Sequence, residues 1–124
     1  MKLLISLTTL LVLSLPAKKC TERKKDSGMY KARLEIKALC MNYTIQLIEG
    51  NLDSSIVSAI WIDESTGKSY NNVFGLDNPC DFPSELNQGD EFYFSIDTVK
   101  GKDCAVCKAY YPTPPKQLAI KVAR

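Results

Sequence analysis

The sequence predicts an all-β fold, a small antiparallel barrel of about six strands. Apolar and polar side chains alternate with a period of two through nearly every apolar segment from residue 29 to the end of the 124-residue chain. No segment carries the 3.6-residue period of a long helix. Closure into a barrel is favoured over an open sandwich because it leaves no unpaired strand edge in a domain of this size.

The first expected strand is the clearest one. From residue 30 to residue 40, small and apolar side chains alternate with charged ones, which places one face of the strand in the core and the other in water. A second strand follows at residues 43–49, and a turn after it is indicated by Glu49, Gly50 and Asn51. We expect these two strands to form a hairpin or a bent pair.

The middle of the chain predicts a second pair of strands. Residues 55–62 are almost continuously apolar, which is typical of a strand buried on both faces or of a barrel strand whose ends change sides. A polar turn at residues 63–68 leads to a partner strand at residues 69–75. Residues 78–86 contain two prolines and no clear period, so we expect a loop with room for one helical turn.

The C-terminal part predicts a hairpin and a final strand. Residues 91–99 alternate again, and a turn at residues 100–103 leads to an expected strand at residues 104–111. The proline-rich segment 112–115 ends that strand, because proline cannot donate to a β-ladder. The last strand is expected at residues 117–122, with Leu118, Ile120 and Val122 facing inward.

The N-terminus has the layout of a cleavable secretory signal. A cationic start precedes an apolar run from Leu3 to Leu15 that ends at Pro16 and Ala17, and this run is shorter than a membrane span. The segment after it is basic and lacks hydrophobic periodicity, as expected for a flexible tether. We therefore expect export to the periplasm or the exterior, with a signal peptide at 1–17, a basic spacer at 18–29 and a β-barrel domain at 30–124.

Cys20 opens an alternative to simple cleavage after Ala17. A bacterial lipoprotein is cleaved directly before an acylated cysteine, normally behind small residues, whereas Lys18 and Lys19 precede this one. We expect ordinary cleavage after Ala17. Acylation of Cys20 stays open, and only through that lipid anchor would the protein be attached to a membrane.

The composition excludes several classes of function. The chain contains no histidine, so it has no Ser-His-Asp or Cys-His nucleophile pair and no imidazole metal ligand. Basic residues concentrate at residues 18–33, whereas residues 34–124 carry twelve acidic and eight basic residues. An acidic barrel argues against nucleic-acid binding. We expect a monomer with no enzymatic activity, no metal and no cofactor.

Four cysteines lie in the expected domain: Cys40, Cys80, Cys104 and Cys107. Export makes disulfides the default state, and four cysteines allow three connectivities. In a regular strand Cys104 and Cys107 would point to opposite faces and lie about 10 Å apart, which is beyond disulfide reach. Each of these two cysteines is therefore expected to pair elsewhere.

The order of features along the chain resembles a family of small secreted bacterial proteins of unknown function with an OB-like β-barrel. The features that carry the resemblance, over residues 30–123, are the strand ending at Cys40, the hairpin from Trp61 to Tyr70, the segment from Phe82 to Leu86 before Gly89, the strand from Phe92 to Ile96, and a Cys-bearing strand that leads through Pro112 and Pro114 to Leu118, Ala119 and Ile120.

In that family a cysteine near the end of the first strand can bridge one in the penultimate strand. The resemblance therefore implies pairing of Cys40 with Cys107 and leaves Cys80 to pair with Cys104. The swapped pairing stays open, because this chain has two cysteines in the 104–107 stretch. The family implies no activity.

Cys104 and Cys107 also form a C-x-x-C motif, which offers an alternative function as a thiol redox or metal-binding protein. Thioredoxin-like chemistry needs the first cysteine at a helix N-terminus in a βαβ fold, whereas this motif is expected in a strand. A four-thiolate zinc site is normally built from two such motifs, and only one is present. We therefore keep this function as the alternative.

The leading interpretation is a non-enzymatic binding or structural module of the bacterial envelope, acting on an envelope or extracellular ligand. Most aromatic residues are expected in the core, where they fill small barrels. The candidates for a binding surface are Trp61, Tyr70, Tyr110 and Tyr111, because rigid amphipathic rings lose little entropy on binding. A secreted enzyme inhibitor that presents residues 112–115 is a further alternative.

Overall fold

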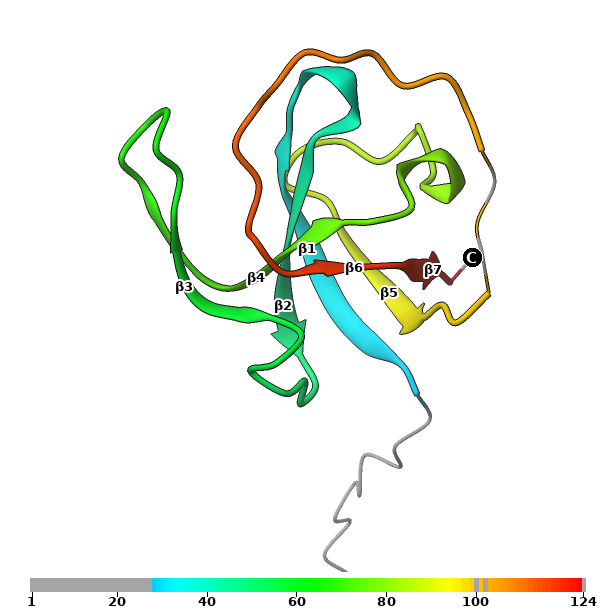
Figure 1. The fold of residues 1–124 in the computed structure, drawn as a ribbon. Coiled ribbons are helices and arrows are strands. Elements are labelled where there is room, and N and C mark those ends of the chain that lie inside the picture. The colour runs from blue at the N-terminus through cyan, green and yellow to red at the C-terminus, as the bar shows by residue number, and fades with distance from the viewer. Residues whose placement is uncertain (1–27, 100, 102, 124) are drawn as a thin grey trace, which may run out of the picture.

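A computed structural model describes residues 28–99, 101 and 103–123, and the domain they form is all-β (Figure 1). The predicted signal peptide, almost all of the predicted basic spacer and Cys20 lie outside the described residues. The strands are β1 (Tyr30–Lys37), β2 (Tyr43–Glu49), β3 (Ser58–Ile62), β4 (Ser69–Leu76), β5 (Glu91–Ile96), β6 (Gln117–Leu118) and β7 (Ile120–Val122). Two 3-10 turns accompany them, η1 (Leu39–Met41) and η2 (Pro79–Asp81).

The strands form one sheet in the order β3-β4-β2-β1-β5-β7, and every pairing along this path is antiparallel. The expected last strand at residues 117–122 is present but divided at Ala119. Its first part, β6, pairs with β4 in the parallel sense over Gly75 and Leu76, and its second part, β7, pairs with β5. The parallel pairing was not expected, and it spans only two residues, so a fully closed barrel is not confirmed.

The alternation predicted for the first strand is confirmed. Ala32, Leu34 and Ile36 of β1 are buried, whereas the charged residues between them face outward. Leu34 packs in a core with Ile45 of β2, Phe74 of β4 and Phe94 of β5, all four of them fully buried. Burying a large apolar side chain contributes about 1.5–3 kcal/mol, so this cluster is the main source of the fold's stability.

The first strand ends earlier than predicted, at Lys37 and not at Cys40. The chain reverses through η1, where Cys40 and Met41 both have left-handed backbones with φ of 57° and 59°. Such φ values are uncommon outside glycine and favour tight reversals. The reversal leads directly into β2, so the predicted hairpin between the first two strands is confirmed.

The prediction that residues 55–62 form a strand buried on both faces is wrong. Strand β3 starts only at Ser58 and lies at the edge of the sheet, where it pairs with β4 alone. Ile60 and Ile62 are 71% and 59% exposed. Because β4 is its one neighbouring strand, β3 has no strand along its outer edge within the described residues, and Figure 1 shows the β3–β4 turn extending away from the rest of the sheet.

The predicted strand at residues 104–111 is also wrong. Residues 103–114, here called the strap, carry no strand, helix or turn, and Figure 1 shows them crossing one end of the sheet as a long connection. The physical reason is that β5, the expected hairpin partner, already pairs with β1 on one edge and with β7 on the other. A β-strand has only two edges, so none is left for the strap.

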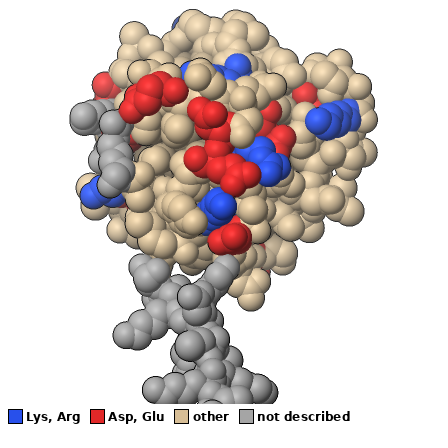
Figure 2. All heavy atoms as spheres, turned by 180° about the vertical axis from the view of Figure 1, so that it is seen from behind, with Lys and Arg blue, Asp and Glu red and all other residues tan. Residues whose placement is uncertain are grey.

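The outer face of β1 and β5 carries an ion-pair network. Glu91 accepts from Lys31 at 3.2 Å and from Arg33 at 3.0 Å, and Arg33 also contacts Glu35 at 3.2 Å. Figure 2 shows acidic and basic side chains interleaved on the face opposite to the view of Figure 1.

The part of the chain that the structure describes contains no helix long and apolar enough to span a membrane.

Candidate functional site

The four aromatic residues predicted as a binding surface lie around the β3–β4 hairpin. Trp61 and Tyr70 stand directly opposite each other in the antiparallel ladder. Their ring centroids are 5.8 Å apart and the rings are tilted by 30°. Directly opposed aromatic residues of this kind stabilise a strand pair. The hairpin thereby presents two adjoining rings on one face.

The other two aromatic residues come from the strap. Tyr110 donates a hydrogen bond from its hydroxyl to Oε1 of Glu64 at 3.1 Å, and Tyr111 donates one to Oδ2 of Asp63 at 2.9 Å. Asp63 directly follows β3. The strap therefore places Tyr110 and Tyr111 beside the hairpin that carries the other two rings, and we call these four residues the aromatic surface: Trp61, Tyr70, Tyr110 and Tyr111.

Asp63 is the centre of this assembly and is fully buried. Its Oδ1 accepts from the backbone N–H of Ser65 at 2.8 Å and from the Ser65 hydroxyl at 2.6 Å. Its carbonyl oxygen accepts from the N–H of Gly67 at 2.7 Å, and Gly67 has a φ of 75°, which glycine adopts readily. Asp63 thus shapes the hairpin turn and holds the strap with the same carboxylate.

Asp63 is a site residue that the sequence pattern did not single out. An aspartate two residues before a serine at the start of a turn is a local signal for side-chain bonding to the backbone. The link to Tyr111 has no such signal, because 48 residues separate the two partners.

The hydrogen bonds set the ionisation of the site. Burial alone would raise the pKa of Asp63, but hydrogen bonds from Ser65 and Tyr111 to its carboxylate outweigh burial and lower the pKa below its ordinary value. Burial raises the pKa of Tyr70, and the negative charge of Asp63 adds to that effect. The hydrogen bond to Glu64 raises the pKa of Tyr110. At neutral pH the site therefore holds a buried carboxylate together with the neutral phenols of Tyr70 and Tyr110.

The aromatic surface is only partly open to solvent. Tyr110 is 77% exposed, whereas Trp61, Tyr70 and Tyr111 are half-buried. The amino group of Lys68 lies 5.1 Å from the centroid of the Tyr70 ring, a cation–π arrangement. The surface thus combines apolar rings with a cation and, at Glu64, a carboxylate.

Two disulfides tie the strap to the rest of the domain. Cys40 bonds to Cys107, with 5.0 Å between the Cα atoms, and Cys80 bonds to Cys104, with 5.6 Å between them. Both distances fall in the normal range for disulfides. This is the pairing that the family resemblance implies.

The disulfides also bear on the alternative function assigned to the C-x-x-C motif. Cys104 and Cys107 are bonded to two different cysteines, so in this structure they form neither a dithiol nor a disulfide with each other. Within the described residues, no group of three or more His, Cys, Asp or Glu side chains is arranged to hold a metal ion. The motif acts here as two separate covalent anchors.

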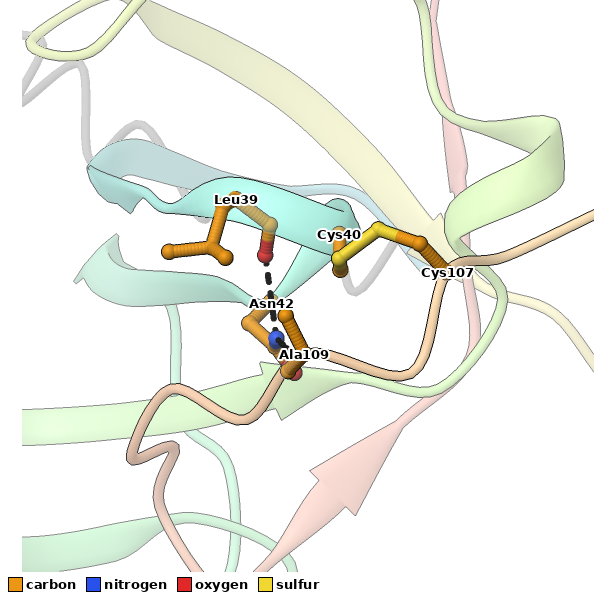
Figure 3. Close-up of a disulfide and its surroundings, with 5 residues drawn as sticks. All are labelled: Leu39, Cys40, Asn42, Cys107 and Ala109. Atoms are coloured by element: carbon orange, nitrogen blue, oxygen red, sulfur yellow. Dashed lines mark hydrogen bonds between the residues drawn. A yellow bond between two sulfur atoms is a disulfide. The ribbon is translucent and has the colours of Figure 1, made fainter.

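Asn42 adds a non-covalent anchor next to the Cys40–Cys107 disulfide. Figure 3 shows its side chain between the η1 reversal and the strap, where Nδ2 donates to the carbonyl oxygens of Leu39 and Ala109 at 3.0 Å each. Asparagine is common at chain reversals for local reasons, so the sequence pattern does not predict the contact of Asn42 with the strap.

Of the segment that an inhibitor would present, residues 112–115, only Pro115 is exposed. Pro112 and Pro114 are both buried. The exposed part of the strap lies before them, at residues 103–110, every one of which is exposed. The two prolines pack toward the body of the domain, where they return the chain to β6.

Comparisons of this chain with protein-family models, with curated protein sequences and with solved structures found no match. The interpretation of the site therefore rests on its own geometry.

Proposed function

We propose that this chain is an exported, non-enzymatic binding module of the bacterial envelope, and that the aromatic surface contacts its ligand. The observation that carries the proposal is the convergence of Tyr110 and Tyr111 from the strap onto the hairpin that bears Trp61 and Tyr70. A surface built from two distant segments and fixed by a buried carboxylate is held rigid before binding. Rigid aromatic surfaces lose little conformational entropy when they bind.

We propose that the fold is a partly open, OB-like barrel. Support comes from the C-terminal segment, of which β7 pairs with β5 and β6 pairs in parallel with β4. These two pairings connect both sides of the sheet through one continuous segment. OB-folds are small, partly open barrels, and they use exposed faces and loops for binding.

Export is supported by the disulfides, because such bonds persist in oxidising compartments. We propose cleavage after Ala17 with Cys20 left as a free thiol. The intact mass of the mature protein, measured after alkylation without reduction, tests this directly. A start at Lys18 with one alkylated thiol supports the proposal, whereas a start at Cys20 with an acyl group makes the protein a lipoprotein.

The ligand class that best suits the aromatic surface is a glycan strand of the envelope. Sugar rings have an apolar C–H face that stacks on aromatic rings and a rim of hydroxyls that bonds to groups such as Glu64 and Lys68. Binding can be followed without a label, because Trp61 is the only tryptophan of the chain.

The test is a titration of the mature protein with soluble peptidoglycan glycan strands, with Trp61 emission as the readout. We expect a saturable change, and Tyr110→Ala should weaken binding by about tenfold or more. Tyr93→Ala is the matched control, since Tyr93 is an exposed tyrosine on β5 away from the hairpin. The proposal would be overturned if Trp61 emission showed no saturable change, or if both variants lost the same amount of affinity. A parallel titration with anionic vesicles is included, and a response to the vesicles but not to the glycan strands would also overturn it.

A further inference from the structure

The exposed half of the strap lacks regular secondary structure. Residues 103–110 are all exposed and contain no turn, bend, helix or strand. Among the residues that the structure describes, no hydrogen bond between main-chain groups joins them to another segment. The main-chain N–H and C=O groups of this segment are therefore available to an incoming partner, except the carbonyl oxygen of Ala109, which accepts from the side chain of Asn42.

This open segment is nevertheless held at two points close together. Cys104 is bonded to Cys80 in η2, and Cys107 is bonded to Cys40 in η1. Only Ala105 and Val106 lie between the two anchors, and we call residues 104–107 the clamped segment. Two residues after Cys107, the carbonyl oxygen of Ala109 accepts a hydrogen bond from the side chain of Asn42.

We propose that the clamped segment inhibits a serine endopeptidase whose S1 pocket accepts small aliphatic side chains, with Ala105 as the residue that enters this pocket. An exposed segment without regular secondary structure can lie in such a cleft, where main-chain hydrogen bonds give affinity and one side-chain pocket gives specificity. Ala105 is exposed and small, which matches an elastase-like pocket. This surface is separate from Trp61 and Tyr70, so the inference does not depend on the proposed function.

The anchors explain why the segment would inhibit and not serve as a substrate. Hydrolysis of the Ala105–Val106 bond consumes one water and leaves a carboxylate on Ala105 and an amine on Val106. Each new end stays one residue from a disulfide that connects it to the body of the domain. The two halves therefore remain in the cleft, where the bond can re-form, and the ordered segment has little entropy to lose on binding.

The experiment tests whether a single substitution at Ala105 changes which protease the protein inhibits. The wild-type protein is assayed against pancreatic elastase, and Ala105→Arg is assayed against elastase and trypsin, with hydrolysis of chromogenic peptides as the readout. We expect inhibition of elastase by the wild type, and for Ala105→Arg a loss of at least about thirtyfold against elastase together with new inhibition of trypsin.

Ala109→Arg is the matched control, because Ala109 is an exposed alanine of the same strap outside the two anchors. We expect this variant to be cleaved by trypsin without inhibiting it. Ala105→Phe, assayed against chymotrypsin, gives a second test of specificity in case the arginine variant fails to fold. Circular dichroism checks that both Ala105 variants are folded.

Failure of the wild type to inhibit elastase, with no gain of inhibition in either folded Ala105 variant, would overturn the proposal. Rapid cleavage after Ala105 that releases active elastase would overturn it as well. Neither result bears on glycan binding by the aromatic surface, which is measured separately.

Discussion

The hydroxyl of Tyr111 donates a hydrogen bond to the buried carboxylate of Asp63, at 2.9 Å, across 48 residues of sequence. This bond joins the strap to the turn of the β3–β4 hairpin, two elements that share no strand pairing. Strand β3 lies at the edge of the sheet and pairs with β4 alone, so its position depends on this link more than that of an inner strand does. The Tyr111–Asp63 bond is therefore a support of the aromatic surface.

Removal of the Tyr111 hydroxyl should weaken this support. Tyr111→Phe deletes the donor and leaves Asp63 with the hydrogen bonds from Ser65. We expect a loss of about 1–2 kcal/mol in the free energy of unfolding, measured by urea denaturation. Tyr110→Phe is the control: its bond to Glu64 is exposed, so its loss should cost less than about 0.5 kcal/mol. Equal losses in the two variants would contradict the role given to Asp63.

The stability of the domain should fall in acid partly through Asp63. The pKa of Asp63 is lower in the folded protein than its ordinary value of 3.8, so the unfolded chain binds a proton more readily. The stabilisation is present above that value and is lost as the pH falls through the lowered folded pKa. Glu91 and Asp53, whose pKa values are also lowered, contribute in the same sense.

Asp63→Asn isolates the contribution of this carboxylate. The variant should be less stable than the wild type at pH 6, and the difference should shrink as the pH is lowered from 4 toward 2. Thermal unfolding across this pH range measures it. A difference that stays constant with pH would show that the charge of Asp63 does not contribute.

The two disulfides should differ in their effect on stability. The Cys40–Cys107 bond spans 67 residues and the Cys80–Cys104 bond spans 24. In the chain-entropy treatment these loops correspond to about 4.4 and about 3.5 kcal/mol. Replacing Cys40 and Cys107 by serine should therefore destabilise the domain more than replacing Cys80 and Cys104, as measured by urea denaturation. Under reducing conditions the wild type and both variants should converge.

Gly50 should tolerate no side chain. Its φ is 112°, and a Cβ built there would overlap Cδ1 of the Tyr30 ring. Gly50→Ala combines backbone strain with displacement of an aromatic ring that packs on Phe94, and we expect a loss of about 2–3 kcal/mol by thermal unfolding. Gly67→Ala is the matched control, because Gly67 also has a positive φ but has open space around it, so its cost should stay near about 1 kcal/mol.

Much of the sheet could be predicted from local pattern. The boundaries predicted for β2 are those observed, and those of β4 differ by one residue. The alternation in β1 identified its buried face correctly, because one face of that strand packs on the core. The pattern failed at two segments. Residues 55–62 are apolar, but the strand they form has a neighbour on one edge only. Residues 104–111 form no strand, because both edges of β5 are already paired.

In the candidate site, too, local pattern predicted some contacts and not others. Trp61 and Tyr70 are cross-strand partners in a hairpin, a relationship that follows from the local turn at residues 63–68. Tyr110 and Tyr111 reach this hairpin only because the strap crosses the end of the sheet. The buried role of Asp63 could not be foreseen, since an acid in a polar turn is normally solvated.

The sequence by itself determined the all-β class, the inward face of β1 and the turn chemistry, because these depend on side chains two to five residues apart. Only the tertiary structure decided the edge position of β3, the parallel pairing of β6 and the path of the strap. These features depend on which strand edges remain free once the other strands have paired and on where two disulfides fix the chain. Such competition between distant segments leaves no periodic signal in the sequence.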